Sequence, residues 1–194
     1  DRDEDGRFRL GLWLFEIGQL VPQHRTLSEA ALPIMTDLQL ATRARIHLAV
    51  LDGIDVVYLE IIGGADLGLA SRTGGRLPAH ATGVGKVLLA YSPVALVKAR
   101  VEAGLPRLTP RTISTPGALT AELQKIRTNG MALDLEESIL GISCVAAPVF
   151  GAQRKVSAAL SITGRTATFD PGKLGPAART AAFTLSRTLK ASGI

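Results

Sequence analysis

The sequence is short of cysteine, of aromatic residues and of long apolar runs, and each shortage excludes a class of protein. Cys144 is the single cysteine among 194 residues, so the chain forms no internal disulfide and no zinc site built from several cysteines. Aromatic residues make up 4% of the chain, which leaves little material for stacking nucleic-acid bases. No apolar run approaches the roughly 18 residues that a membrane-spanning helix needs.

Apolar material, in contrast, is present in the amount that one folded core requires. Hydrophobic residues make up 46% of the chain and charged residues 20%, a balance typical of a folded domain rather than of a disordered or fibrous chain. A length of 194 residues supports one sizeable core, or one domain with an appended helix. The chain does not begin with methionine, and we expect it to be part of a longer protein.

The net charge of +5 is unevenly distributed along the chain. Acidic residues outnumber basic residues over 1–60, and basic residues outnumber acidic residues over 61–194. The basic residues of the second part stand singly rather than in runs, for example Arg72, Arg76, Lys86, Lys98, Arg107 and Lys125. This pattern favours a solvated basic surface that attracts small anionic ligands over a surface that binds nucleic acid directly.

Two helices are predicted at the start of the chain. Residues 8–21 are apolar at nearly heptad spacing, which predicts a helix that packs against another domain or another subunit. Thr26 and Glu29 have the spacing of a capping box, which predicts a second helix beginning there, with Pro33 bending its second turn. The apolar positions of the first helix are Leu10, Trp13, Leu14, Ile17, Leu20 and Val21.

Two β-hairpins are predicted, separated by helices. The first joins 45–51 to 55–62 through a tight turn, and the second joins 142–150 to 155–163. A further short strand is expected near 66–70. Helix-start signals lie at Thr82-Gly83, Ser92-Pro93, Thr115-Pro116 and Pro171. Hairpins with interposed helices predict an α+β fold, a central antiparallel sheet with helices packed on it.

The helix start at 82–86, Thr-Gly-Val-Gly-Lys, is a candidate anion site. The first amides of a helix have no helical partner and carry partial positive charge. Gly83 and Gly85 remove side chains that would block approach, so the end could hold a carboxylate through backbone N–H groups. The alternative is an ordinary threonine N-cap whose small residues pack on the sheet.

The second hairpin predicts a patch of small and polar side chains. Strand alternation places Ser161 and Thr163 on one face, and Ile142 and Cys144 on one face of the partner strand. If these faces coincide, the patch leaves space for a ligand and offers hydroxyls to orient it. The alternative is routine hydrogen bonding of the hydroxyls to nearby backbone.

Acidic residues, the cysteine and the histidines are the other candidate functional groups. Asp134 precedes the second hairpin and could accept a hydrogen bond from a ligand, whereas Glu136 and Glu137 are expected to form a solvated acidic turn. Cys144 would need a base and a lowered pKa to act as a nucleophile, and a buried inert thiol is the favoured interpretation. The three histidines, His24, His47 and His80, are too dispersed to predict a metal site, and His80 is expected to orient its loop through hydrogen bonds.

Several segments, taken together and in order, form a recognisable series. They are Arg9-Leu-Gly11, His47-Leu-Ala-Val-Leu-Asp-Gly53, Val57-Tyr-Leu-Glu60, Arg76-Leu-Pro-Ala-His-Ala-Thr-Gly-Val-Gly-Lys86, Thr109-Pro-Arg-Thr-Ile113, Gly141-Ile-Ser-Cys-Val-Ala-Ala-Pro148 and Ala158-Ala-Leu-Ser-Ile162. The series resembles the effector-binding region of the IclR family of bacterial transcription regulators, from about residue 7 to the C-terminus. The blocks around His80 and Cys144 are specific as a pair.

The resemblance implies an organisation that composition alone does not. It implies that 1–22 is a linker helix following a winged helix-turn-helix that these residues lack, and that 23–194 is an effector-binding domain with a GAF-like, profilin-like fold. It implies a cytoplasmic homodimer or homotetramer that contacts operator DNA only through the absent N-terminal domain. No cofactor, metal, membrane or catalytic activity is expected.

The resemblance also implies a site for a small organic, carboxylic acid, aromatic acids included. Backbone amides that hold the carboxylate match Gly83 and Val84. The other matching positions are acidic Asp134, apolar Ile142, Cys144 and two hydroxyls, Ser161 and Thr163. The last is often serine in the family, and the threonine methyl is expected to shrink the pocket. Two rival hypotheses are an oligomerisation module without a ligand and an enzyme that uses Cys144.

Overall fold

A single antiparallel sheet forms the centre of the domain. The computed structural model describes residues 6–8, 11–19, 22–63 and 71–193. Its strand order is β3-β2-β1-β6-β5-β4, which confirms the predicted α+β fold. The strands are β1 (Arg45–Asp52), β2 (Asp55–Ile62), β3 (Arg76–Pro78), β4 (Ala132–Leu135), β5 (Ile142–Phe150) and β6 (Val156–Arg165). The α-helices are α1 (Leu12–Gln19), α2 (Pro22–Thr42), α3 (Gly83–Ala90), α4 (Val94–Glu102), α5 (Pro116–Asn129) and α6 (Pro171–Ala191).

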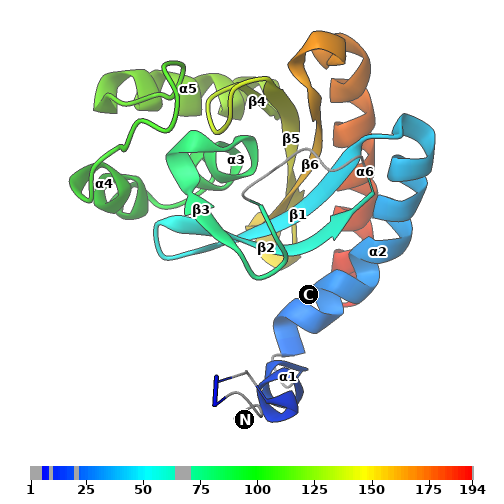
Figure 1. Ribbon diagram of the computed structural model, residues 1–194. Helices are drawn as coiled ribbons and strands as arrows, with labels where there is room; N and C mark the ends of the chain where they lie inside the picture. Colours follow the sequence, from blue (N-terminus) through cyan, green and yellow to red (C-terminus); the bar gives the residue numbers. More distant parts are fainter. Residues whose placement is uncertain (1–5, 9–10, 20–21, 64–70, 194) are drawn as a thin grey trace.

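Helices cover both faces of the sheet and divide the core in two. On one face α2 and α6 pack against side chains such as Leu48, Val145 and Leu160. On the other face α3 packs on the strands, with α5 behind it (Figure 1). Because strand side chains alternate between faces, the α3 side receives the intervening residues, which include Ala146 and Ala159.

Both predicted hairpins are confirmed, and their registers decide what lies on the α3 side. Cys144 pairs with Thr163, and Ala146 pairs with Ser161, so the two predicted polar faces coincide. On the other hairpin the register shifts between Leu48 and Ala49, so that Ala49 stands opposite Tyr58. Such a bulge re-aims the side chains beside it, and here it brings the Tyr58 ring onto the α3 side.

Several local predictions were wrong, and each error reflects tertiary context. The capping box at Thr26 does not start a helix, because α2 already begins at Pro22. Residues 76–78 form the edge strand β3 and 132–135 form β4, and the sequence pattern revealed neither strand. Within the Ser92-Pro93 helix-start signal, Pro93 is the N-cap, and α4 begins at Val94. The strand expected near 66–70 lies outside the described residues.

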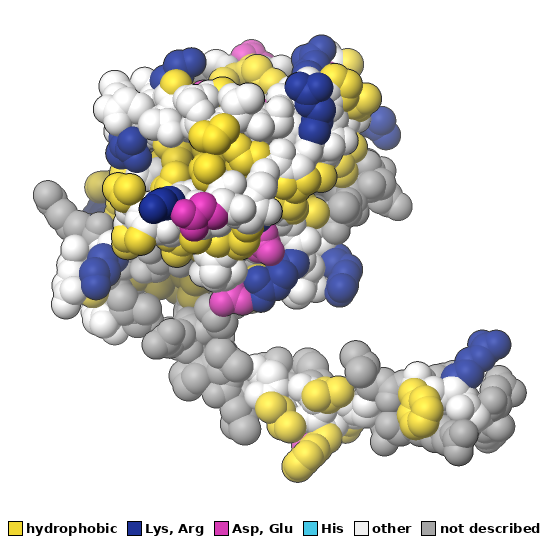
Figure 2. All heavy atoms as spheres, turned by 90° about the vertical axis from the view of Figure 1, so that its left-hand side faces the viewer, with side chains coloured by type: hydrophobic (Ala, Val, Ile, Leu, Met, Phe, Trp, Pro, Cys, Tyr) yellow, Lys and Arg dark blue, Asp and Glu magenta, His cyan; other side chains and the backbone are white. Residues whose placement is uncertain are grey.

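The N-terminal helix exposes its apolar side chains. In α1, Trp13 is 74% exposed, and Leu12, Leu14 and Ile17 are exposed as well. Phe8, which precedes the helix, is 85% exposed. Figure 2 shows apolar side chains on an arm that extends away from the body of the domain. Leu10, Leu20 and Val21 of the predicted stripe lie outside the described residues. In the part of the chain that the structure describes, no helix is both long and apolar enough to cross a membrane.

The start of α3 approaches its neighbours so closely that it needs glycine. A Cβ atom on Gly85 would lie 2.2 Å from the carbonyl oxygen of Ala79, a backbone atom that cannot move aside. Lys86 N–H bonds back to the Thr82 carbonyl at 2.9 Å, and the Thr82 hydroxyl accepts from Gly85 N–H at 3.1 Å. The 79–81 turn and the first turn of α3 are therefore locked together.

We expect Gly85→Ala to destabilise the domain by about 1–3 kcal/mol or more, because the added methyl group overlaps backbone. Gly117→Ala is the matched control, since Gly117 lies in α5 with no atom within 4 Å of its added Cβ. There alanine should stabilise by roughly 0.5–1 kcal/mol through helix propensity. Urea unfolding of both variants measures the difference, and equal stabilities would contradict the packing argument.

Candidate ligand-binding site

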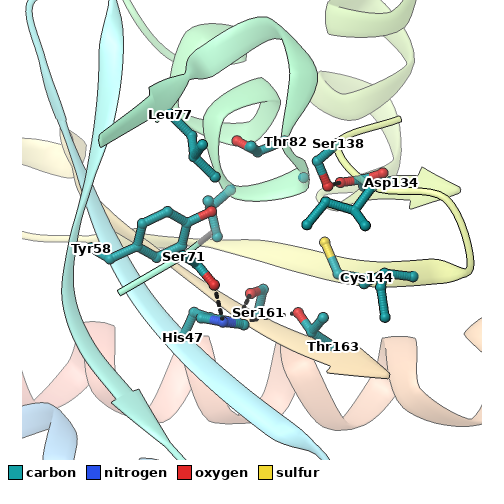
Figure 3. A pocket seen from close by; sticks show the side chains of 14 residues that line it. His47, Tyr58, Ser71, Leu77, Thr82, Asp134, Ser138, Cys144, Ser161 and Thr163 are labelled. Atoms are coloured by element: carbon teal, nitrogen blue, oxygen red, sulfur yellow. Dashed lines mark hydrogen bonds between the residues drawn. The ribbon is translucent and has the colours of Figure 1, made fainter. Parts of the chain in front are cut away.

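One cavity lies between the start of α3 and the sheet, and all seven predicted site residues line it (Figure 3). They come from four elements. These are α3 with Gly83 and Val84, β4 with Asp134, β5 with Ile142 and Cys144, and β6 with Ser161 and Thr163. Asp134 pairs with Cys144, which pairs in turn with Thr163, so three adjacent strands present these side chains side by side.

The cavity also has walls that sequence reasoning missed. The residues that the sequence did not indicate are His47, Tyr58, Ser71, Ser138 and Ile139, and the lining is completed by Leu77 and by Thr82 of the predicted helix start. The signal for His47 was present in part, since alternation places it on one face of its strand. What the sequence did not reveal is that β1 pairs with β6, which puts His47 directly opposite Ser161.

His47 connects the polar side chains at the sheet end of the cavity. Its Nδ1 lies 3.4 Å from Ser161 Oγ and 3.2 Å from Thr163 Oγ1, and its Nε2 lies 3.2 Å from Ser71 Oγ. The Tyr58 ring packs against the imidazole edge-on, with centroids 5.4 Å apart. Burial, aided by the charge of Arg45, lowers the pKa of His47 to about 3, so the imidazole is neutral at physiological pH.

The thiol of Cys144 is chemically passive in this setting. Burial raises its pKa, and the nearby Asp134 carboxyl adds to the rise. A catalytic cysteine needs the opposite shift, because the thiolate is the nucleophile. The Gly83 N–H donates to the sulfur, so the group contributes to packing and hydrogen bonding at the end of α3.

At the start of α3 the sequence left two interpretations open, a site for a carboxylate and an ordinary threonine N-cap. Thr82 is the N-cap of α3, and its side chain accepts from the Gly85 N–H, as the second interpretation predicts. Gly83 and Val84, whose amides belong to the first turn of the helix, nevertheless both line the cavity. A Cβ atom on Gly83 would lie 2.6 Å from Cys144 Sγ, so a glycine here lets the helix end reach the sheet.

Asp134 is buried and already serves the adjoining turn. Its Oδ1 accepts from Glu137 N–H at 2.7 Å, and its Oδ2 accepts from the Ser138 hydroxyl at 2.8 Å. Burial raises its pKa, while the Ser138 hydrogen bond and the charge of Lys86 oppose the rise. Asp134 therefore shapes the cavity wall in addition to facing the cavity.

Lys86 and Glu137 correct two sequence predictions. Lys86 was expected on a basic surface and Glu137 in a solvated turn, but both are buried and ion-paired with each other. Lys86 Nζ also donates to the Leu133 carbonyl at 2.7 Å, so the lysine joins α3 to β4. Glu136 is only half-buried, with Arg111 Nε 3.7 Å from its carboxylate.

A second set of hydrogen bonds, from the loop before α5, holds the turn that follows β4. The hydroxyls of Thr109 and Thr112 donate to the backbone carbonyls of Glu136 and Glu137, at 2.7 Å and 2.6 Å. His80 is buried, and its Nε2 lies 3.1 Å from the Pro106 carbonyl, which fits its predicted part in orienting its loop. The loop before α5, the turn after β4 and the start of α3 thus form one connected wall.

The cavity itself is small. Its volume is about 30 Å³, which is room for one or two water molecules. A cavity that admits benzene is about 150 Å³. An aromatic acid therefore requires the walls to move apart, whereas a short aliphatic acid requires less movement.

No group of three or more potential metal ligands occurs among the residues described. Of the buried charged groups in this region, Lys86 is paired with Glu137, and Asp134 accepts hydrogen bonds from the adjoining turn.

Comparisons with known proteins show what the chain is similar to. The family model described as bacterial transcriptional regulator IclR C-terminal matches residues 19–187. The HTH-type transcriptional regulator XynR of Escherichia coli is 39% identical over 173 residues, covering 88% of this chain and 69% of XynR. The chain spans about two thirds of the length of this and two further curated relatives.

Solved structures with the same fold include two that hold a ligand. An IclR homologue of Microbacterium hydrocarbonoxydans complexed with 4-hydroxybenzoate superposes with a TM-score of 0.91 at 29% identity, covering 98% of this chain and 79% of that one. A double mutant of the PobR inducer-binding domain of Acinetobacter, complexed with 3-hydroxybenzoic acid, gives 0.72 at 30% identity over 81% of this chain and 96% of that one.

We expect Lys86→Met alone to cost about 3–5 kcal/mol, because it leaves the Glu137 carboxylate buried without its cation. The double variant Lys86→Met/Glu137→Met should recover most of that loss, since it removes both charges together. Chemical unfolding of the two single variants and the double variant gives the coupling free energy. A double variant as unstable as the sum of the singles would show that the pair is not coupled.

Proposed function

Because the chain belongs to the IclR family of bacterial transcriptional regulators, we propose that it is the effector-sensing and oligomerisation domain of such a regulator. The effector is a small organic acid bound in the cavity between α3 and the sheet. In the whole regulator, operator DNA is bound by a winged helix-turn-helix domain that precedes these residues, and 1–22 act as the linker. The named relatives are transcriptional regulators, which favours sensing over catalysis.

The observation that carries the proposal is the convergence of all seven predicted residues on one cavity with two different ends. At the α3 end, the cavity is lined by Gly83 and Val84, whose amides lie at the positive end of the helix dipole, and the Gly83 N–H donates to the Cys144 sulfur. The charge of buried Lys86 adds to this, since it opposes the rise that burial causes in the pKa of both Asp134 and Cys144. A carboxylate is the group that such an end stabilises.

Binding is coupled to movement because the cavity is smaller than its ligand. A ligand that needs more than about 30 Å³ must bind a wider state, and its binding energy shifts the population toward that state. The walls that must part are the start of α3 and the turn after β4. The Lys86–Glu137 pair joins these two segments, so they move together rather than separately.

A panel of small aliphatic and aromatic carboxylates should contain at least one member that raises the melting temperature of the chain. A ligand at 100 times its dissociation constant adds about 2.7 kcal/mol of stability. Ser161→Ala should weaken that ligand roughly tenfold, because it removes a hydroxyl from the cavity wall. Ser157→Ala, an exposed serine on the same strand, is the control and should bind normally. A flat panel would favour an oligomerisation module without a ligand.

The exposed apolar face of α1 supports the oligomerisation part of the proposal. A cluster of exposed apolar side chains on one short helix is typical of a surface that pairs with another chain. Such a surface on the linker would transmit a change in subunit packing to attached DNA-binding domains.

Trp13→Glu should therefore weaken self-association, since it places a charge in the centre of this face. Glu16→Gln, on the same helix, is the control and should leave association unchanged. Sedimentation velocity across a concentration series measures both variants against the unmodified chain. A chain that is monomeric at all concentrations, or a Trp13→Glu variant that associates as the unmodified chain does, would contradict this surface.

A further inference from the structure

We propose that His47 makes the domain selective for hydroxy acids, by orienting the Ser161 and Thr163 hydroxyls toward a hydroxyl group of the effector. The inference rests on the proposed function, since it names the chemical class of the ligand for the same cavity. It adds His47 as a positioning residue and assigns the sheet end of the cavity to a neutral polar group.

Two hydroxyl groups in the cavity share one nitrogen of His47. Ser161 Oγ and Thr163 Oγ1 both lie within 3.4 Å of the same atom, His47 Nδ1. A neutral imidazole nitrogen either donates one hydrogen or accepts through one lone pair, so it satisfies one of the two hydroxyls well. The second hydroxyl retains hydrogen-bonding capacity, and both residues line the cavity. Buried polar groups are normally satisfied, so this surplus predicts a polar ligand atom here.

The tautomer of His47 determines which kind of ligand atom the free hydroxyl can bond. If His47 Nε2 donates to Ser71, then Nδ1 accepts from one hydroxyl; if Nε2 accepts from Ser71, then Nδ1 donates. The two tautomers leave the free hydroxyl oriented differently toward the ligand. A ligand hydroxyl both donates and accepts, so it complements the site in either tautomer, whereas a methyl group complements neither.

The two ends of the cavity differ in the groups that they present to a ligand. His47 is 3% exposed and neutral, and Arg45, whose charge helps to lower its pKa, is not among the residues that line the cavity. The α3 end presents the first amides of a helix and lies near buried Lys86. Figure 3 shows the two ends on opposite sides of the cavity, with Thr82 on the α3 side and His47, Ser161 and Thr163 on the sheet side. The effector therefore places its carboxylate at α3 and its hydroxyl at the sheet.

Matched acid pairs test this directly on the unmodified chain. Lactate is compared with propanoate, and 4-hydroxybenzoate with benzoate, by calorimetry or thermal shift. In each pair that binds, the hydroxy acid should bind about tenfold tighter than its partner, because the partner leaves the cavity hydroxyl unsatisfied. Binding of acids without any preference for the hydroxyl would overturn the inference and leave the proposed function intact. Binding of no acid would overturn both.

Two substitutions at His47 separate positioning from packing. His47→Asn keeps a polar atom near the place of Nδ1, and His47→Gln keeps one near the place of Nε2. We expect Asn to preserve most of the hydroxyl preference and Gln to reduce the affinity ratio of each pair toward one. If both variants keep the affinity ratio of the unmodified chain, His47 has only a packing role.

A third variant covers the case in which neither His47 variant folds. Thr163→Val keeps the shape of the side chain and removes its hydroxyl, and it should lower the affinity ratio while leaving the deoxy acid bound as before. A ratio unchanged from that of the unmodified chain would overturn the assignment of the sheet end to a ligand hydroxyl.

Discussion

The structure depends on the close approach of one helix end to the sheet. α3 meets its neighbours at Gly83 and Gly85, where any side chain would overlap the Cys144 sulfur or the Ala79 backbone. This approach brings the first amides of the helix to the strand residues that face them. It also buries Lys86 one residue further along, within reach of Glu137. The cavity and its buried ion pair are therefore consequences of one packing contact that only glycine permits.

Buried polar groups give the cavity two chemically different ends. Near α3 the first amides of the helix lie at the positive end of its dipole, and the ammonium group of Lys86, paired with Glu137, lies close by. At the sheet, His47 is held neutral by burial, and hydroxyl groups surround it. A ligand with one anionic and one neutral polar group satisfies both ends, which no purely apolar or purely anionic ligand does. The same arrangement explains why the thiol of Cys144, raised in pKa by burial, serves packing rather than chemistry.

The small volume of the cavity would couple ligand binding, as proposed, to movement of its walls. A cavity of about 30 Å³ has room for one or two water molecules, so a larger ligand would have to separate walls that are held together by packing and hydrogen bonds. One of those walls is braced by Thr109 and Thr112, whose hydroxyls hold the backbone of the turn after β4. Movement of that wall is transmitted through connected segments rather than absorbed locally, because close-packed interiors deform little.

The sequence by itself determined the local elements and the faces of the strands. Glycine turns and two-residue alternation were enough to predict both hairpins and to place Ser161, Thr163 and Cys144 on shared faces, because these patterns act over a few residues. Tertiary structure alone decided which strands became neighbours, and so placed His47 opposite Ser161. It also decided that Lys86 and Glu137, which resemble surface residues in sequence, are buried together. Pairing between distant segments depends on how the whole chain packs, and no local pattern records it.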